Sequence, residues 1–212
     1  MSIMRVNPTR MELTTMKRRL ATAKRGHKLL KDKRDELVRR FIQIVRENAS
    51  LREQVEQALG GALRDFSMAS AVMEPGALYQ ALLYPARQAA FTMDRRNILS
   101  VRVPVFHMDE DSLGKTVLPY GLAETSAQLD GAIETMAQVL PLLIKLAETE
   151  KTSSLLADEI QKTRRRVNAL EYVMIPQFEE TIRYITMKLD ENERGALTRL
   201  MKVKDMIAER AT

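Results

Sequence analysis

A heptad pattern of apolar residues runs through the first third of the chain. Starting at Leu13, the inward positions are spaced alternately by three and four residues for about seven heptads, which is typical of a coiled-coil helix. These positions are Leu13, Met16, Leu20, Ala23, His27, Leu30, Arg34, Leu37, Phe41, Ile44, Asn48, Leu51, Val55, Ala58 and Ala62. The pattern predicts a helix from about Thr9, where Glu12 completes a capping box, to Phe66.

Three of these inward positions, His27, Arg34 and Asn48, are polar. Polar residues inside a coiled coil generally fix the register or the partner at some cost in stability. A second interpretation is that each lies near a solvated edge and is merely tolerated. We expect these three residues to set the register, and the sequence leaves the second interpretation open.

The heptads stop in residues 67–121, where prolines and glycines become frequent. Residues 78–84 predict a short helix. Apolar or β-branched runs at 89–93 and 98–106 predict a β-hairpin over about 89–106, with the polar residues 94–97 as its turn. Val101, Val103 and Val105 would share the buried face, and Pro104 would lie on an edge strand.

A second helical pattern follows residue 121. Its inward positions are Leu129, Ile133, Met136, Leu140, Leu143, Ala147, Leu156, Ile160, Thr163, Val167, Leu170 and Met174. Pro141 should bend the helix locally. Beyond Pro176 the pattern shifts its phase to Phe178, Ile182, Ile185 and Leu189, and a weaker stripe at Leu197, Leu200, Val203 and Ile207 ends the chain.

These patterns predict a mainly α fold with three segments. Residues 1–66 and 122–212 would form a long antiparallel two-helix coiled coil, because two long helices that are separated by a short segment pack most simply in opposite directions. Residues 67–121 would form a small head with the short helix and the hairpin.

Composition argues against catalysis by this chain. There is no cysteine, and the two histidines, His27 and His107, are far apart in the sequence. We find no phosphate-binding loop, dinucleotide fingerprint or nucleophile elbow, and we expect no cofactor or metal. The acidic run at 109–111 lacks calcium-loop spacing and should be a solvated loop. No apolar stretch is long enough for a membrane span.

Basic residues gather near the two ends of the chain. Residues 1–40 contain 13 Lys or Arg against 4 Asp or Glu, whereas residues 41–161 contain 10 against 16. The candidate partner contacts are a basic cluster of Lys17, Arg18, Arg19, Lys24 and Arg25 and an arginine triplet of Arg164, Arg165 and Arg166. A solvated helix face without a partner is the ordinary interpretation of such charge runs, and the sequence leaves it open. Between the two kinds of partner we expect protein rather than nucleic acid, because the charges lie within heptad helices and not in a separate basic arm.

The arginine triplet covers three successive sides of its helix, so its members cannot all face one partner. We expect at least one to pair across the coiled coil with Asp32, Asp35 or Glu36.

Two segments carry a family resemblance. NPTRMELTTMKRRLATAKRGHKLLKDKRDEL, residues 7–37, and KTRRRVNALEYVMIPQFEETIRYI, residues 162–185, resemble the two long helices of the D subunit of V-type and archaeal-type rotary ATPases. ILSVRVP, residues 98–104, is similar to the hairpin region of that family.

The resemblance implies a non-catalytic central shaft that transmits torque between ATP hydrolysis or synthesis and ion transport. It implies that the shaft lies inside a hexamer of catalytic A and non-catalytic B subunits, with the small F subunit bound to it and a funnel-shaped subunit between it and the membrane ring. It also implies a peripheral position on the cytoplasmic side of the membrane, and a hairpin that regulates the ATPase rate.

Several questions stay open at this point. A free-standing coiled-coil scaffold or homodimer is the competing hypothesis for the same heptad pattern. The coupled ion, proton or sodium, and the net direction of the reaction are properties of other subunits, so this sequence does not choose between them.

Overall fold

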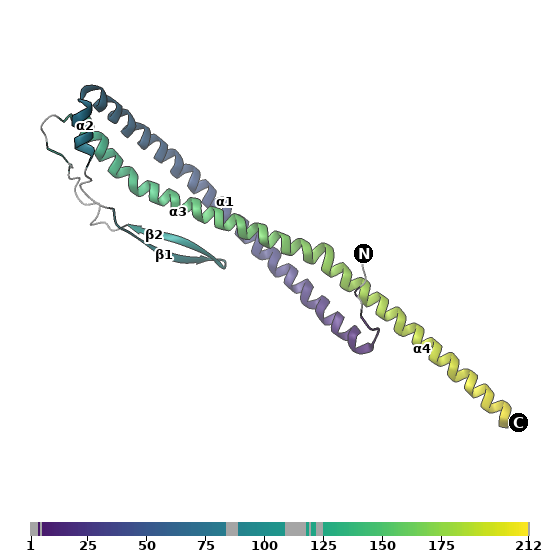
Figure 1. Ribbon diagram of the computed structural model, residues 1–212. Coiled ribbons are helices and arrows are strands. Elements are labelled where there is room, and N and C mark those ends of the chain that lie inside the picture. The colour runs from purple at the N-terminus through teal and green to yellow at the C-terminus, as the bar shows by residue number, and fades with distance from the viewer. Residues whose placement is uncertain are drawn as a thin grey trace. The chain divides into compact units, whose positions relative to one another are not determined.

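The N-terminal heptad segment forms a single long helix, α1 (Arg10–Val72), in a computed structural model of the chain (Figure 1). Thr9 caps its start, because the Glu12 backbone N–H donates to Thr9 Oγ1 at 3.2 Å, but the second bond of the expected capping box is replaced: the Thr9 N–H donates to the Asn7 carbonyl at 2.9 Å. The helix passes through Gly60 and Gly61 and continues beyond the expected end at Phe66. The structure describes residue 4 and residues 6–83, 89–108, 118, 120–121 and 125–211, with side chains as far as 207.

The C-terminal segment is helical throughout but changes its winding once. It consists of α3 (Ala127–Ala169), a π-helical turn η2 (Leu170–Met174) and α4 (Ile175–Ala211). Pro176 explains the turn, because proline lacks an N–H and its ring collides with the carbonyl four residues earlier, and a wider turn relieves both problems. The Ile175 N–H accordingly donates to the carbonyl of Leu170, five residues back. The expected phase shift near Pro176 therefore has a local cause.

The chain divides into two compact units, each containing part of α1 and part of the C-terminal helical segment. Unit 1 consists of Met1–Asp35 and Gln161–Thr212, and unit 2 consists of Glu36–Ile160. The mainly α fold with two long helices packed together, a short helix and a hairpin is confirmed.

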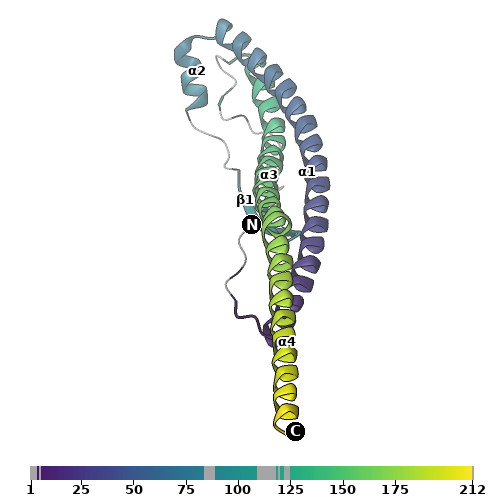
Figure 2. The same cartoon turned by 90° about the vertical axis from the view of Figure 1, so that its right-hand side faces the viewer.

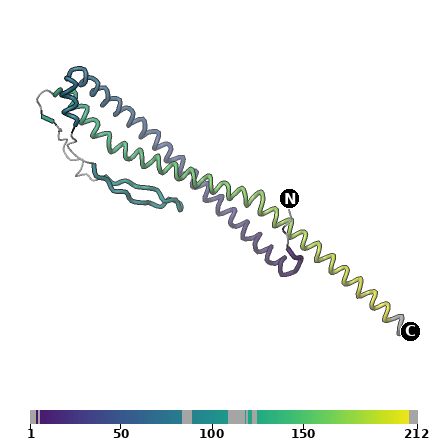
Figure 3. The backbone as a smooth tube through the Cα atoms, viewed as in Figure 1, coloured from purple at the N-terminus to yellow at the C-terminus, as the bar shows by residue number. Residues whose placement is uncertain are grey.

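In unit 1 the start of α1 runs antiparallel to α4. Met16 is buried against Phe178 and Ile185. Arg10 pairs with Glu193, and Lys24 pairs with Glu179. A residue later in α1 therefore meets a residue earlier in α4, as antiparallel helices require. Figure 3 traces the backbone, in which α4 runs on past the first turn of α1.

In unit 2 the rest of α1 packs along α3 in the same antiparallel sense. Leu37 lies in one cluster with Leu156, and Ala69 lies in another with Leu129. Figure 2 shows the two helices side by side. Every inward position predicted on α1 is buried or half-buried. α3 also continues through Pro141.

The inward face of α3 differs from the predicted one in its first half. Met136 and Leu143, which were expected inside, are 40% and 37% exposed, and Ala147 is also exposed. Ala132, Val139 and Thr152 are buried instead. Nearly every residue between 136 and 147 is apolar, so the sequence contains two competing apolar stripes. Packing against α1 buries the stripe that begins with the small residue Ala132.

Strands β1 (Phe91–Ile98) and β2 (Val101–Met108) form the predicted antiparallel hairpin, but the expected turn at 94–97 is wrong. The turn consists of Leu99 and Ser100, whose φ angles are 50° and 75°. Positive φ at both central residues is typical of a two-residue hairpin turn, although neither residue favours it. The burial of Val101 and Val103 against Leu37 and Leu156 offsets the cost of this turn.

The short helix α2 (Pro75–Leu82) begins at its proline, a position at which a missing N–H costs nothing. Ala81 of α2 joins Ala69 and Leu129 in the second cluster of unit 2. Tyr120 packs on this cluster and donates its hydroxyl to Asp130 Oδ1 at 2.6 Å. Burial, followed by this hydrogen bond, raises the pKa of Tyr120, so the hydroxyl keeps its proton throughout the ordinary pH range.

We expect the buried leucine at position 37 to contribute far more stability than an exposed leucine on the same helix. Leu37→Ala should lower the free energy of unfolding by about 2–5 kcal/mol, because the side chain is fully buried and leaves a cavity. Leu29→Ala makes the same chemical change at a residue that is 69% exposed and should cost about 0.5 kcal/mol or less. Urea unfolding followed by circular dichroism measures both, and equal losses would contradict this account of the core.

Candidate partner-binding surface

The basic cluster (Lys17, Arg18, Arg19, Lys24 and Arg25) lies on the outer side of α1 in unit 1. All five side chains are exposed, while the neighbouring Met16 and Leu20 pack inward on the apolar cluster with Phe178. The helical repeat of 3.6 residues therefore turns the cluster away from α4. Its charges are available to a partner without any change in the helix pairing.

Most of the basic cluster is unpaired within the described part of the chain. Lys24 Nζ binds Glu179 Oε1 at 2.7 Å, and both side chains are about half exposed. Among the residues that the structure describes, no carboxylate pairs with Lys17, Arg18, Arg19 or Arg25. Lys24 is therefore partly used in holding α1 to α4, and the other four residues carry uncompensated positive charge.

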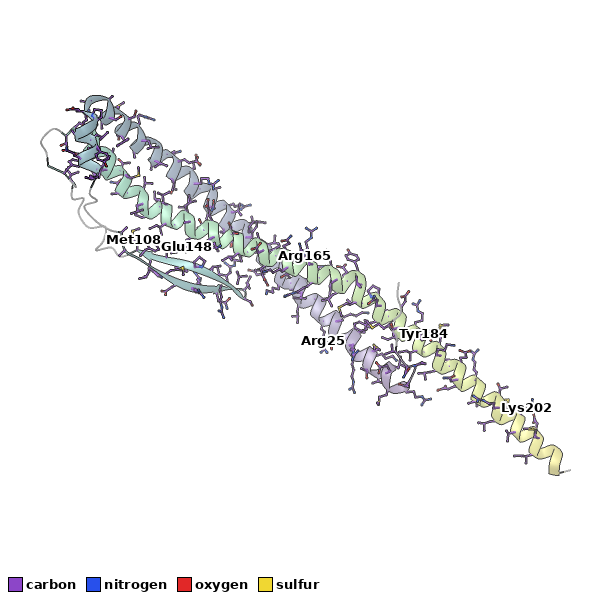
Figure 4. All side chains as sticks on the ribbon, viewed as in Figure 1. Arg25, Met108, Glu148, Arg165, Tyr184 and Lys202 are labelled. Atoms are coloured by element: carbon purple, nitrogen blue, oxygen red, sulfur yellow. The ribbon has the colours of Figure 1, made fainter. Side chains whose placement is uncertain are left out.

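The arginine triplet (Arg164, Arg165 and Arg166) is also exposed, between two buried residues of α3, Thr163 and Val167. Its expected pairing across the coiled coil is wrong. Asp35 binds Arg34 at 2.7 Å, and Glu36 binds Arg39 and Arg40 on its own helix, so nearer cations occupy these carboxylates. Figure 4 shows Arg25 and Arg165 on opposite sides of the helix pair of unit 1.

The three polar residues of the α1 seam each have a polar neighbour. His27 Nε2 lies 3.4 Å from Glu171 Oε2, and its side chain is 20% exposed. Arg34 turns to Asp35, the next residue. The Asn48 amide donates to Thr149 Oγ1 on α3 at 3.5 Å. His27 and Asn48 thus contact residues of the C-terminal helical segment, Arg34 contacts its own neighbour, and the register role of the three residues stays a prediction.

An exposed apolar stripe near the end of α4 is more evident in the structure than in the sequence. The weak stripe predicted at the end of α4 is exposed, with Leu197 at 58%, Leu200 at 65% and Ile207 at 63%. Arg10 in the first turn of α1 pairs with Glu193, so the residues that follow on α4 extend past the end of α1. We call Leu197, Leu200, Val203 and Ile207 the α4 stripe. Its periodicity was visible in the sequence, but its exposure among the described residues was not.

Groups that could support chemistry are scattered. No group of three potential metal ligands occurs in the described part of the chain. His107 lies 3.6 Å from Asp94, both on the exposed hairpin. The acidic run 109–111 lies outside the described residues. A search of the described helices finds none that is long and apolar enough to cross a membrane.

Comparison with known proteins gives one consistent result. The family model for the ATP synthase D subunit matches residues 12–205. The V-type ATP synthase D subunit of Acetivibrio thermocellus is 58% identical over 212 residues, which is 100% of this chain and 96% of that protein. The D subunit of a Thermoanaerobacter species is 55% identical over 207 residues, which is 98% of this chain and 99% of that protein. A Clostridium botulinum D subunit is 58% identical over 207 residues, covering 97% and 96% respectively.

We expect the polar group at position 48 to lower stability while it specifies the pairing of α1. Asn48→Leu should raise the free energy of unfolding by about 1 kcal/mol, because a half-buried amide with a long hydrogen bond is replaced by an apolar group. The same change should add self-associated species, because an apolar seam tolerates other partners.

Gln54→Leu, at an exposed position of the same helix, is the control and should change stability by about 0.5 kcal/mol or less. Urea unfolding and light scattering measure the two effects. A single monomeric species for Asn48→Leu would exclude a role in register.

Proposed function

Because the chain belongs to the family of the V-type ATP synthase D subunit, a non-catalytic central-stalk component of rotary ATPases, we propose that it transmits torque as the shaft of such a complex. Its proposed partners are a hexamer of catalytic A and non-catalytic B subunits, the small F subunit and a funnel-shaped subunit next to the membrane ring. The proposed location is peripheral, on the cytoplasmic side of the membrane.

The observation that carries the proposal is the antiparallel pairing of α1 in both units. Met16 is buried against Phe178 in unit 1, and Leu37 against Leu156 in unit 2. Two helices that share a long apolar interface resist bending and twisting better than one, because deformation must separate packed side chains. A shaft that conveys torque needs this resistance.

The outward charges suit contacts that form and break during rotation. The unpaired members of the basic cluster are exposed, and exposed ion pairs contribute roughly 0–1 kcal/mol each. Contacts of this strength attract the carboxylates of a surrounding hexamer without trapping one rotational angle. We propose that the basic cluster and the arginine triplet face the hexamer, on different sides of the shaft.

The α4 stripe supports the same placement. Four large apolar side chains, each roughly half exposed or more, form one face of a helix that extends past its neighbour. An apolar surface contributes contact area without a preferred angle, because the hydrophobic effect is non-directional. We propose that this stripe turns within an apolar collar of the hexamer.

We expect neutralisation of the basic cluster to weaken assembly with the hexamer. A variant with Lys17→Ala, Arg18→Ala and Arg19→Ala should bind a reconstituted hexamer about tenfold more weakly, with a smaller dependence on salt, because three attractive charges are lost. Titration of labelled protein at two salt concentrations measures both quantities.

The control removes positive charge from the same helix outside the cluster. Arg39→Ala combined with Arg40→Ala breaks pairs with Glu36 and should leave the affinity within about twofold. Unchanged binding of the triple variant, or equal weakening of both variants, would reject the proposed contact.

We expect the hairpin to raise the rate of ATP turnover in the assembled complex. Replacing Phe91–Met108 by a short glycine–serine linker should lower turnover without preventing assembly, because the change removes Val101 and Val103 from one cluster but leaves the apolar clusters around Met16 and Ala69 intact. The measurements are ATPase rate and size-exclusion profile of the reconstituted complex.

Val103→Ala is a control for structural damage, since it uncovers the buried cluster around Leu37 but keeps the outer face of the hairpin. Its turnover should stay close to that of the unmodified complex. Unaltered turnover after hairpin replacement would reject the regulatory role.

A further inference from the structure

A groove in unit 2 separates the outer face of the hairpin from α3. Opposite residues of an antiparallel pair share a face, and Met93 lies opposite Phe106 while Arg95 lies opposite Pro104. Met93, Pro104 and Phe106 therefore form one face, with Leu155 of α3 facing them across a groove of about 570 Å³. We call this space the hairpin groove. Its floor is apolar, although Met93 is 54% exposed.

The charged residues that line the groove are all basic. Arg95, Arg102 and Lys151 line it, and none of the described residues lining it is acidic. These three side chains are exposed and form no ion pair with any other described residue. The only carboxylate of β1, Asp94, lies on the other face of the hairpin, where it approaches His107.

The opposite face of the hairpin provides an internal comparison. The groove on that side is lined by Arg40 and Arg96 but also by Glu36, Glu47 and Glu148, so its charges are largely balanced within the chain. A net positive lining thus distinguishes the hairpin groove. Uncompensated cations around an apolar floor attract a partner that carries both carboxylates and large apolar side chains.

The hairpin is held mainly by β2, with Ile98 at the end of β1 also packed on the cluster around Leu37 and Leu156. The Phe106 backbone N–H donates to Glu148 Oε2 at 2.9 Å, which covers one edge of the two-stranded sheet. β1 forms the other edge, and seven of its eight positions are exposed, including Phe91, which packs edge-on against Phe106 with ring centroids 5.9 Å apart. An uncovered edge with apolar side chains is typical of a surface that a partner covers. Figure 4 marks Met108 and Glu148, where the strand and α3 meet.

We propose that the hairpin groove binds an acidic segment of another protein of the complex, with an apolar side chain of that segment inserted between Met93 and Leu155. A second copy of this chain fits less well, because a symmetric contact would set the same cations against each other. The groove deepens the proposed role of the hairpin, since a segment bound here would couple the hairpin to the rest of the complex.

Photo-crosslinking in the purified complete complex tests the proposal. Met93→p-benzoylphenylalanine places the reactive group in the groove, and Thr92→p-benzoylphenylalanine places it at the adjacent position on the opposite face. We expect the first variant alone to form an adduct with another protein of the complex, mapped by mass spectrometry to a segment rich in Asp or Glu. No adduct, or an adduct with lipid, with a second copy of this chain or with a segment that lacks acidic residues, would overturn the proposal.

Charge reversal tests the electrostatic part. Arg95→Glu, combined with the crosslinker at position 93, should lower the adduct yield about fivefold and make the yield less sensitive to salt. Arg96→Glu makes the same change one residue away on the other face and should leave the yield within about twofold. Equal yields for the two variants would contradict recognition by charge.

The two failures can be told apart. An adduct together with unaltered turnover after hairpin replacement would retain this binding site and remove the regulatory role. Reduced turnover after hairpin replacement, without an adduct, would retain the regulatory role and remove this binding site.

Discussion

Burial of the apolar seam along α1 is the interaction on which the rest of the structure depends. Met16, Leu37 and Val55 are almost completely buried, and burying such a side chain contributes roughly 1.5–3 kcal/mol. A helix as long as α1 has no other means of keeping its apolar residues from water, so it must pair along its length. The pairing uses the inward positions and leaves the charged ones outside, which produces both the stiffness and the basic surface.

Continuity of this seam requires one local deviation. The π-helical turn η2 adds a residue to the helix path just before Pro176, which both removes the conflict with proline and rotates the following residues. As a result Phe178 and Ile185 face Met16 in unit 1. A helix with regular winding through residues 170–174 would carry these two side chains to a different side.

A protein that works mechanically places unusual demands on its surface. Enzymes gather polar groups in a water-excluded pocket, whereas the ion pairs described here lie mostly at the surface and are weak, as is that of Lys24 with Glu179. Such pairs adjust quickly to a changing partner. The hairpin groove differs from this background, because it combines an apolar floor with three basic side chains.

The long helices, the inward positions of α1, the hairpin and the family could all be determined from the sequence, because each depends on local periodicity or on segments such as residues 7–37. The hairpin turn at Leu99 and Ser100 and the stripe that α3 buries depended on tertiary structure. In each case several local solutions have similar energies, and the choice is made by contacts between residues far apart in the chain, as when Val103 reaches Leu37. Local pattern cannot contain that information.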